Sequence, residues 1–182
     1  GLGVSGSNIS YHPVVFVSVY DIPAGVPHML QNKSGGHLEH LVFALPPFDP
    51  TDIYLIKEEY SIGETHPLLL PEVQDCFDGA KILSYVFPHL DLSIAVGRVT
   101  NNSARRKQPH YHKKITERIY VVEGSGFIEI NHIRQPIQSG DWICINPDTK
   151  HALLNEALEE LVAVCSCFPA FWVEDVHYCA GA

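Results

Sequence analysis

Four side chains with metal-binding chemistry are spaced so that they can converge in a small β structure. His110 and His112 are two positions apart, so in an extended strand both point to one face, about 7 Å apart along the backbone. Glu117 lies an odd number of positions after His112, so an unbroken strand would send it to the opposite face. We therefore predict a turn at Lys113–Lys114, after which Glu117 opens a second strand.

A fourth candidate ligand follows a turn further along the chain. A strand led by Gly140 runs into the sequence Asn146–Asp148, and His151 comes next, as another strand is expected to begin. Ile119 and Val121 share the face of Glu117 in its strand, which we expect to end at the glycine turn 124–126. Three imidazoles and one carboxylate form a ligand set for a borderline transition metal.

The elements that must position these residues are strands. Residues 80–85, 90–100 and 161–167 alternate apolar and polar side chains or form short apolar runs, whereas helix signals are scarce throughout. The segment 57–79 is mixed and reads as a short turn or helical piece followed by a loop. We predict an all-β fold, a small antiparallel barrel of jelly-roll type.

The spacing of these residues resembles the two sequence motifs of the cupin superfamily. The first motif is matched by His110, His112, Glu117 and Gly124, and the second by Gly140, His151 and Asn155. Departures from the family pattern affect turns and not ligands: they are Ala104 for a glycine, Asn146 for a proline and Asp148 for a glycine. The resemblance implies a divalent transition metal ion (Fe, Mn, Ni or Zn) held by His110, His112, Glu117 and His151.

An N-terminal stretch resembles the second motif again. Pro23, Gly25, His28 and Asn32 have its spacing, and no His-x-His pair precedes them. We predict a half-cupin-like β segment over residues 1–60, docked on the barrel or on a partner, a connecting segment 61–79 and a complete barrel over 80–182. A truncated second domain is the alternative. The repeat suggests internal duplication. We expect His28 to cap or pack at a turn, and His37 and His40 to be exposed. Leu41, Phe43 and Leu45 are expected to form the apolar face of a strand.

Composition narrows the function classes. A formal charge of -9 argues against a nucleic-acid groove, and no apolar run is long enough to span a membrane. Five cysteines without a disulfide-scaffold spacing indicate a reducing compartment, and no signal peptide is recognisable, so we expect a cytoplasmic protein. Cys165 and Cys167 are interpreted as buried core thiols. The basic run 105–107 flanks the mouth of a site or is a solvated loop.

The sequence leaves the reaction open. Four protein ligands could close a tetrahedral zinc site, or an octahedral ion could keep two positions for substrate, water or dioxygen. The family resemblance favours an enzyme acting on a small organic molecule by dioxygenase, isomerase or lyase chemistry, and implies a homodimer. The alternatives are a non-catalytic metal-holding binding or sensor module and a purely structural barrel. Neutral imidazoles are needed for ligation, so metal affinity should fall below about pH 6.

Several side chains would discriminate between these functions. Aromatic side chains such as Phe127 or Trp142 plugging the site would favour the module. Arg98 could bind a substrate carboxylate or lie on the surface. Tyr111 and Tyr120 lie on strand faces opposite the ligands, so we assign no catalytic acid or base.

Overall fold

The computed structural model describes residues 19–55, 72–75, 80–102 and 109–179. The chain divides into two compact units, residues 1–69 and 70–182. Expectations for residues 1–18, for 57–71 and 76–79, for Ala104 and for the basic run 105–107 fall outside the described residues.

The described part of the first unit is irregular. Residues 19–55 contain the 3-10 turn η1 (Pro50–Asp52) and no strand. Asp49 caps the start of this turn, because its carboxylate accepts a hydrogen bond from the backbone N–H of Thr51 at 2.8 Å. Residues 41–45 therefore do not form the expected strand. They are followed by Pro46 and Pro47, which have no backbone N–H donors. His28, His37 and His40 are exposed. The assignment of residues 1–60 as a half-cupin-like segment stays a prediction.

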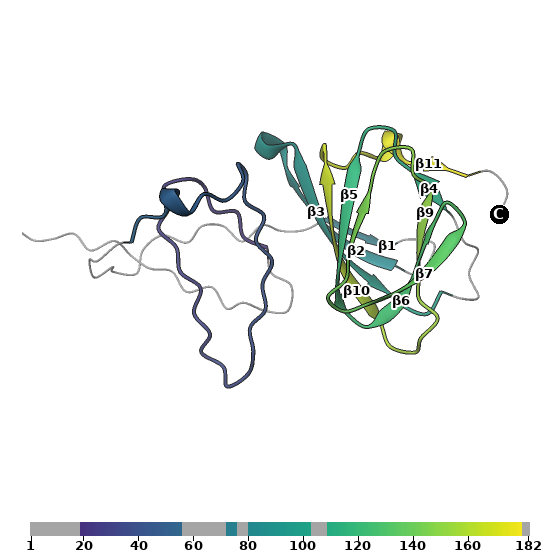
Figure 1. Cartoon of the computed structure of the whole chain (residues 1–182), viewed down its shortest axis with the longest axis horizontal. Helices are drawn as coiled ribbons and strands as arrows, with labels where there is room; N and C mark the ends of the chain where they lie inside the picture. Colours follow the sequence, from purple (N-terminus) through teal and green to yellow (C-terminus); the bar gives the residue numbers. More distant parts are fainter. Residues whose placement is uncertain (1–18, 56–71, 76–79, 103–108, 180–182) are drawn as a thin grey trace, which may run out of the picture. The chain divides into compact units, whose positions relative to one another are not determined.

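The second unit consists of two antiparallel sheets that face each other (Figure 1). The six-stranded sheet has the order β1-β2-β3-β10-β5-β8, and the five-stranded sheet has the order β11-β4-β9-β6-β7. The strands are β1 (Glu72–Asp75), β2 (Ala80–Phe87), β3 (Leu92–Val99), β4 (His110–Tyr111), β5 (Thr116–Glu123), β6 (Ser125–Ile130), β7 (Ile133–Gln138), β8 (Trp142–Ile145), β9 (His151–Leu154), β10 (Leu161–Phe168) and β11 (His177–Tyr178). Two further 3-10 turns are η2 (Pro88–Leu90) and η3 (Val173–Asp175).

This arrangement confirms the predicted all-β jelly-roll barrel. The expected strands at 80–85, 90–100 and 161–167 appear as β2, β3 and β10. The barrel begins earlier than predicted, because β1 pairs with β2 in register from Glu72↔Ser84 to Asp75↔Lys81. In the described residues, no helix has the length and hydrophobicity needed to cross a membrane.

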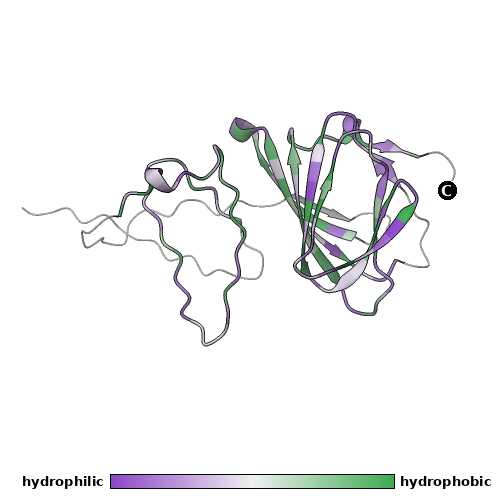
Figure 2. Ribbon diagram, viewed as in Figure 1, coloured by the Kyte–Doolittle hydropathy of each residue, from purple (hydrophilic) through white to green (hydrophobic). Residues whose placement is uncertain are grey.

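The hydrophobic core lies between the two sheets. Val121, Ile128 and Leu161 are at most 1% exposed, and they come from β5, β6 and β10. Strands β3 and β10 are hydrophobic along most of their length (Figure 2), and both of their faces are buried. A strand buried on both faces has an almost continuous apolar sequence, which explains the run at 161–167.

Turns at both ends of the barrel depend on left-handed backbone. Gly124 has φ +83 between β5 and β6, and an added Cβ would collide with the Glu160 carbonyl oxygen. Asp148 occupies the position where the family motif has glycine, and it has φ 60. Aspartate tolerates this conformation better than most residues, so the departure from the motif is accommodated. The Asp148 N–H donates to the carbonyl oxygen of His112 at 2.6 Å.

Candidate metal centre

The barrel brings the four sequence-predicted ligands together. His110 is in β4, His112 follows it, Glu117 is near the start of β5 and His151 begins β9. One ligand atom from each residue can be chosen so that all four atoms lie within 4.8 Å of one another. His110 is directly opposite His151 in the ladder between β4 and β9, and their ring centroids are 4.3 Å apart.

The predicted turn after His112 is present and aims Glu117 into the barrel. Strand β4 ends at Tyr111, β5 begins at Thr116, and the intervening residues form a bend. Ile119 and Val121, which share the face of Glu117, belong to the core cluster. The two parts of the first motif therefore lie in different sheets and meet across the barrel interior.

Backbone carbonyl groups fix the orientation of two of the imidazoles. Nδ1 of His112 donates to the carbonyl oxygen of Asp175 at 3.0 Å, and Nδ1 of His151 donates to that of Thr149 at 2.9 Å. Because a carbonyl oxygen can only accept, Nδ1 carries the proton in both rings. In the neutral form of each ring, Nε2 then presents a lone pair to the interior.

Both of these Nε2 atoms face the carboxylate of Glu117. The distances to Oε2 are 3.1 Å from His151 and 3.8 Å from His112. The side chains are buried, with exposures of 13% for Glu117 and 3% for each histidine. A carboxylate oxygen opposite an imidazole lone pair is stable in a buried site only if a cation, either a proton or a metal ion, lies between them.

The electrostatics of the cluster show the same demand for positive charge. Burial by itself would raise the pKa of Glu117, but the hydrogen bond with His151 and the three nearby imidazoles lower it overall. Burial would lower the pKa of His151, but the hydrogen bond and the charge of Glu117 raise it. The site therefore stabilises an ionised carboxylate next to a positively charged group.

The donor set and its spacing fit a transition metal ion. Bonds of about 2.1 Å place two ligand atoms of one ion roughly 3.0–4.2 Å apart, depending on whether they are adjacent or opposite. The 3.1 Å and 3.8 Å separations between Glu117 and the two histidines lie in this range.

Two cysteines line the interior next to this cluster, but their thiols are poor ligands. Burial, with the charge of Glu117 as the next contribution, raises the pKa of Cys165 well above its ordinary value. Burial and the same carboxylate raise the pKa of Cys167 to about 12. Metal ligation and nucleophilic attack both require the thiolate, so these neutral thiols act as core residues, as predicted for Cys167 and Cys165.

Other residues that the sequence singled out lie away from the cluster. Arg98 forms an ion pair with Glu160 at 3.0 Å, and Trp142 is 56% exposed beside Tyr120. Tyr111 stacks on His177, with ring centroids 5.1 Å apart. Phe127 lies on the outer side of β6 beneath the Arg134 guanidinium, whose Cζ is 3.5 Å from the ring centroid. Neither Phe127 nor Trp142 plugs the site.

Sequence reasoning missed the residues that follow β10. Asp175 binds the loop after His112, the ring of Phe171 lies 6.1 Å from that of His112, and Tyr178 is opposite His110 in the ladder of β11 with β4. Burial would raise the pKa of Asp175, but hydrogen bonds from three backbone N–H groups lower it. No motif spacing marks these residues, because they reach the site only through the pairing of β11 with β4.

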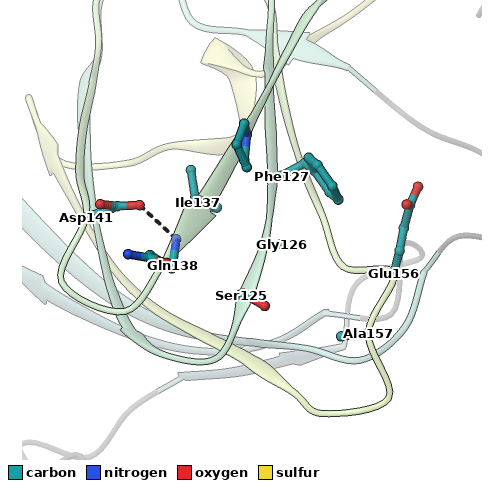
Figure 3. A pocket seen from close by; sticks show the side chains of 9 residues that line it. Ser125, Gly126, Phe127, Ile137, Gln138, Asp141, Glu156 and Ala157 are labelled. Atoms are coloured by element: carbon teal, nitrogen blue, oxygen red, sulfur yellow. Dashed lines mark hydrogen bonds between the residues drawn. The ribbon is translucent and has the colours of Figure 1, made fainter.

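A separate pocket of about 430 Å³ lies at the other end of β5 (Figure 3). Its lining residues are Ser125, Gly126, Phe127, Pro136, Ile137, Gln138, Asp141, Glu156 and Ala157. Its two carboxylates are already engaged, because Asp141 accepts from the backbone of Gln138 at 2.8 Å and Glu156 pairs with Arg134 at 2.6 Å. We therefore assign the chemistry to the His–Glu cluster and not to this pocket.

Comparison with known proteins finds a family model that matches part of the barrel. Residues 99–167 match the family model described as the cupin domain, and both ligand motifs lie inside this range. The second unit therefore contains a cupin domain.

An uncharacterized protein of Methanocaldococcus jannaschii is 29% identical over 68 residues. The aligned stretch covers 37% of this chain and 54% of that relative, so it spans about half of the relative's length.

Solved structures agree with this fold. A structure of Streptomyces Pac13 with uridine is 20% identical, with a TM-score of 0.51, covering 64% of this chain and 92% of that chain. A further structure of Pac13, described as a nucleoside dehydratase, is 21% identical with a TM-score of 0.50, covering 63% of this chain and 92% of that chain. At this level of identity, the likeness concerns the fold alone.

Proposed function

We propose that this protein is a metal-dependent cupin that acts on a small organic molecule at a site formed by His110, His112, Glu117 and His151. A divalent transition metal ion, Fe, Mn, Ni or Zn, would be held by the three imidazoles and the carboxylate. The reaction class would be that of a dioxygenase, an isomerase or a lyase.

One observation carries this proposal: two imidazole lone pairs face a buried carboxylate. The protons of His112 and His151 are committed to backbone carbonyl groups, so their Nε2 atoms and Glu117 leave a position that needs a cation. A proton can satisfy one of these contacts at a time. A divalent ion satisfies all of them at once, and the donor types are those that such ions prefer.

When bound, the ion would act as a Lewis acid toward a substrate oxygen or toward water. The chain itself supplies orientation, through the fixed imidazoles, and a surrounding of buried apolar side chains that strengthens electrostatic interactions. Phe127 and Trp142 lie away from the site and do not plug it. A plugged site would have favoured the non-catalytic module. The module remains the alternative to turnover.

The solved cupins that resemble this chain are compatible with a small-molecule substrate. The Streptomyces Pac13 structure was determined with uridine, and Pac13 is described as a nucleoside dehydratase. Because the likeness concerns the fold alone, it supports the class of small organic ligands and not a nucleoside in particular.

Elemental analysis tests the metal site. We would purify the wild type, His112→Ala and His37→Ala without added metal. His37 is exposed, so its replacement makes the same chemical change away from the site. We expect about one equivalent of a transition metal per chain in the wild type and in His37→Ala, and a clear loss in His112→Ala.

The identity of the metal directs the next step. Iron, manganese or nickel would support an open site and lead to screening of oxidative or lyase substrates. Zinc would require a test of turnover to separate an enzyme from a structural site. Absence of metal from all three proteins, even after reconstitution, would contradict the proposal.

We also propose a homodimer. The outer face of the edge strand β8 exposes Trp142, which packs beside Tyr120 of β5 with ring centroids 4.9 Å apart. An exposed tryptophan on an edge strand, packed beside a half-buried tyrosine of the neighbouring strand, is a suitable dimer contact. Light scattering after size-exclusion chromatography, with Trp142→Ser as the variant, measures the mass directly. A monomeric wild type at micromolar concentration would contradict this proposal.

A further inference from the structure

The segment Phe171–Cys179, which we call the C-terminal clamp, lies beyond the part of the chain that matches the cupin domain. It contains η3 and β11, and it returns to β4, the strand that carries His110. We propose that the clamp is a positioning element of the metal centre and that Asp175 holds the loop between the first-motif ligands His112 and Glu117. This inference rests on the proposed function, because it concerns the same site.

The carboxylate of Asp175 accepts hydrogen bonds from three backbone N–H groups of this loop. Oδ1 accepts the N–H of Lys113 at 3.1 Å, and Oδ2 accepts those of Lys114 at 3.1 Å and Ile115 at 3.2 Å. Asp175 is only 4% exposed, so these hydrogen bonds are shielded from water. Hydrogen bonds to an ionised acceptor are stronger than neutral ones, and three of them fix the path of the bend.

The same residue also orients a ligand. The backbone carbonyl of Asp175 accepts the Nδ1 proton of His112 at 3.0 Å, which directs Nε2 into the cluster. Phe171 places its ring edge-on to His112, with centroids 6.1 Å apart. His112 is thus held through its ring by the clamp and through the following loop by the Asp175 carboxylate. A metal ligand whose second nitrogen is fixed in this way binds its ion more tightly.

The loop needs this external support because it passes from one sheet to the other. His112 belongs to the five-stranded side and Glu117 to the six-stranded side, so residues 113–115 leave one sheet before they enter the other. Their N–H groups point at Asp175, and a buried N–H group without an acceptor would be costly. The clamp also pairs with β4, where the Cys179 N–H donates to the Pro109 carbonyl at 2.9 Å.

Asp175→Asn tests this role with a minimal change. Asparagine keeps the size and the backbone carbonyl, but it replaces one carboxylate oxygen by an NH₂ group that faces N–H donors. The matched control is Glu174→Gln, which removes a neighbouring charge at an exposed position. We expect the affinity for added Mn²⁺ or Zn²⁺ to fall about 10- to 100-fold in Asp175→Asn and to stay within about twofold of the wild type in Glu174→Gln.

Amide hydrogen exchange of the metal-free proteins gives a second readout. In Asp175→Asn, the amides of residues 113–115 should exchange faster, whereas those of β3 and β10 should keep wild-type protection. If Asp175→Asn does not fold, a titration of the wild type decides: metal binding should slow exchange at residues 113–115, because loop and ligands are linked. Unchanged exchange there would overturn the inference.

The outcomes separate this inference from the proposed function. Equal metal affinity of the wild type and Asp175→Asn would overturn the role of the clamp and leave the metal site intact. A wild type that binds no metal would overturn both.

Discussion

Nε2 of His151 lies 3.1 Å from Oε2 of Glu117, while Nδ1 of the same ring donates its proton to the Thr149 carbonyl. In metal-free protein, this short contact requires a second proton on the ring. The imidazolium would then pair with the carboxylate, which explains why the pKa of His151 is raised and that of Glu117 is lowered. A metal ion must displace this proton, so proton and metal compete for one position.

We predict that metal affinity rises with pH through the raised pKa of His151. Below that pKa, each bound ion releases one proton from His151, so affinity should change about tenfold per pH unit. The midpoint should lie above the ordinary histidine pKa of 6.5, higher than the pH of about 6 expected from sequence. Metal titrations between about pH 5.5 and 8.5 measure this. An affinity independent of pH across this range would contradict the proton on His151.

Near neutral pH, the stability of the metal-free protein should fall as pH rises, whereas the metal affinity rises. Glu117 has a lowered folded pKa, so its contribution is present above 4.5 and is lost as pH falls through the lower folded value. His151 has a raised folded pKa, so its contribution is present below 6.5 and is lost as pH rises through the higher folded value. The pair therefore contributes most between these values, which thermal unfolding after chelation would show.

Glu117→Gln should separate metal binding from folding. The amide keeps the shape but removes the buried charge, so metal affinity should fall at least tenfold. The amide NH₂ can donate to the His151 lone pair, and the variant has no charge to desolvate at this position. The free energy of unfolding of the metal-free variant near pH 7 should therefore differ from that of the wild type by less than about 1 kcal/mol. Thermal unfolding with and without metal measures both effects. Wild-type stabilisation by metal in this variant would exclude Glu117 as a ligand.

Replacing each of three glycines by alanine should lower the free energy of unfolding by a different amount, because each position needs glycine for a different reason. Gly140 has φ +95 and open space, so Gly140→Ala should cost about 1–2 kcal/mol from strain alone. Gly126 lacks a positive φ, but an added Cβ would meet the Leu154 carbonyl oxygen, so Gly126→Ala should cost about 1–3 kcal/mol. Gly124 combines both problems, so Gly124→Ala should cost the most. Denaturant unfolding gives the order, and equal values for all three would refute it.

The N-terminal segment is expected to need a packing partner, which is the barrel or another copy of the chain. Among its described residues, Val42, Phe48 and Leu45 are 75%, 70% and 48% exposed. Expression of residues 61–182 alone should yield a less soluble or less stable protein than the full chain, because apolar surface on the barrel or the partner would lose its cover. Light scattering and thermal unfolding of the two proteins make the comparison. A soluble, monomeric fragment of unchanged stability would contradict this expectation.

The sequence predicted most strands and the cluster of three histidines and one glutamate because both depend on local spacing. Two histidines at i and i+2 share a face in any extended strand, and the apolar and polar patterns of β2 and β3 are visible without tertiary contacts. The positive-φ turn at Gly124 followed from residue type. The strand expected near residues 41–45 was wrong because a strand also needs a pairing partner, which local alternation does not reveal.

Only the tertiary structure determined how the side chains of this cluster are held. The Lys113 N–H and the Asp175 carboxylate are 62 residues apart, and they meet because β11 pairs with β4. Residue types and spacing determined which atoms could bind a metal, since those depend on backbone geometry within a few residues. The direction of the His112 ring, the proton on His151 and the path of the loop to Glu117 depend on hydrogen bonds between distant segments, and such bonds leave no periodic signal in the sequence.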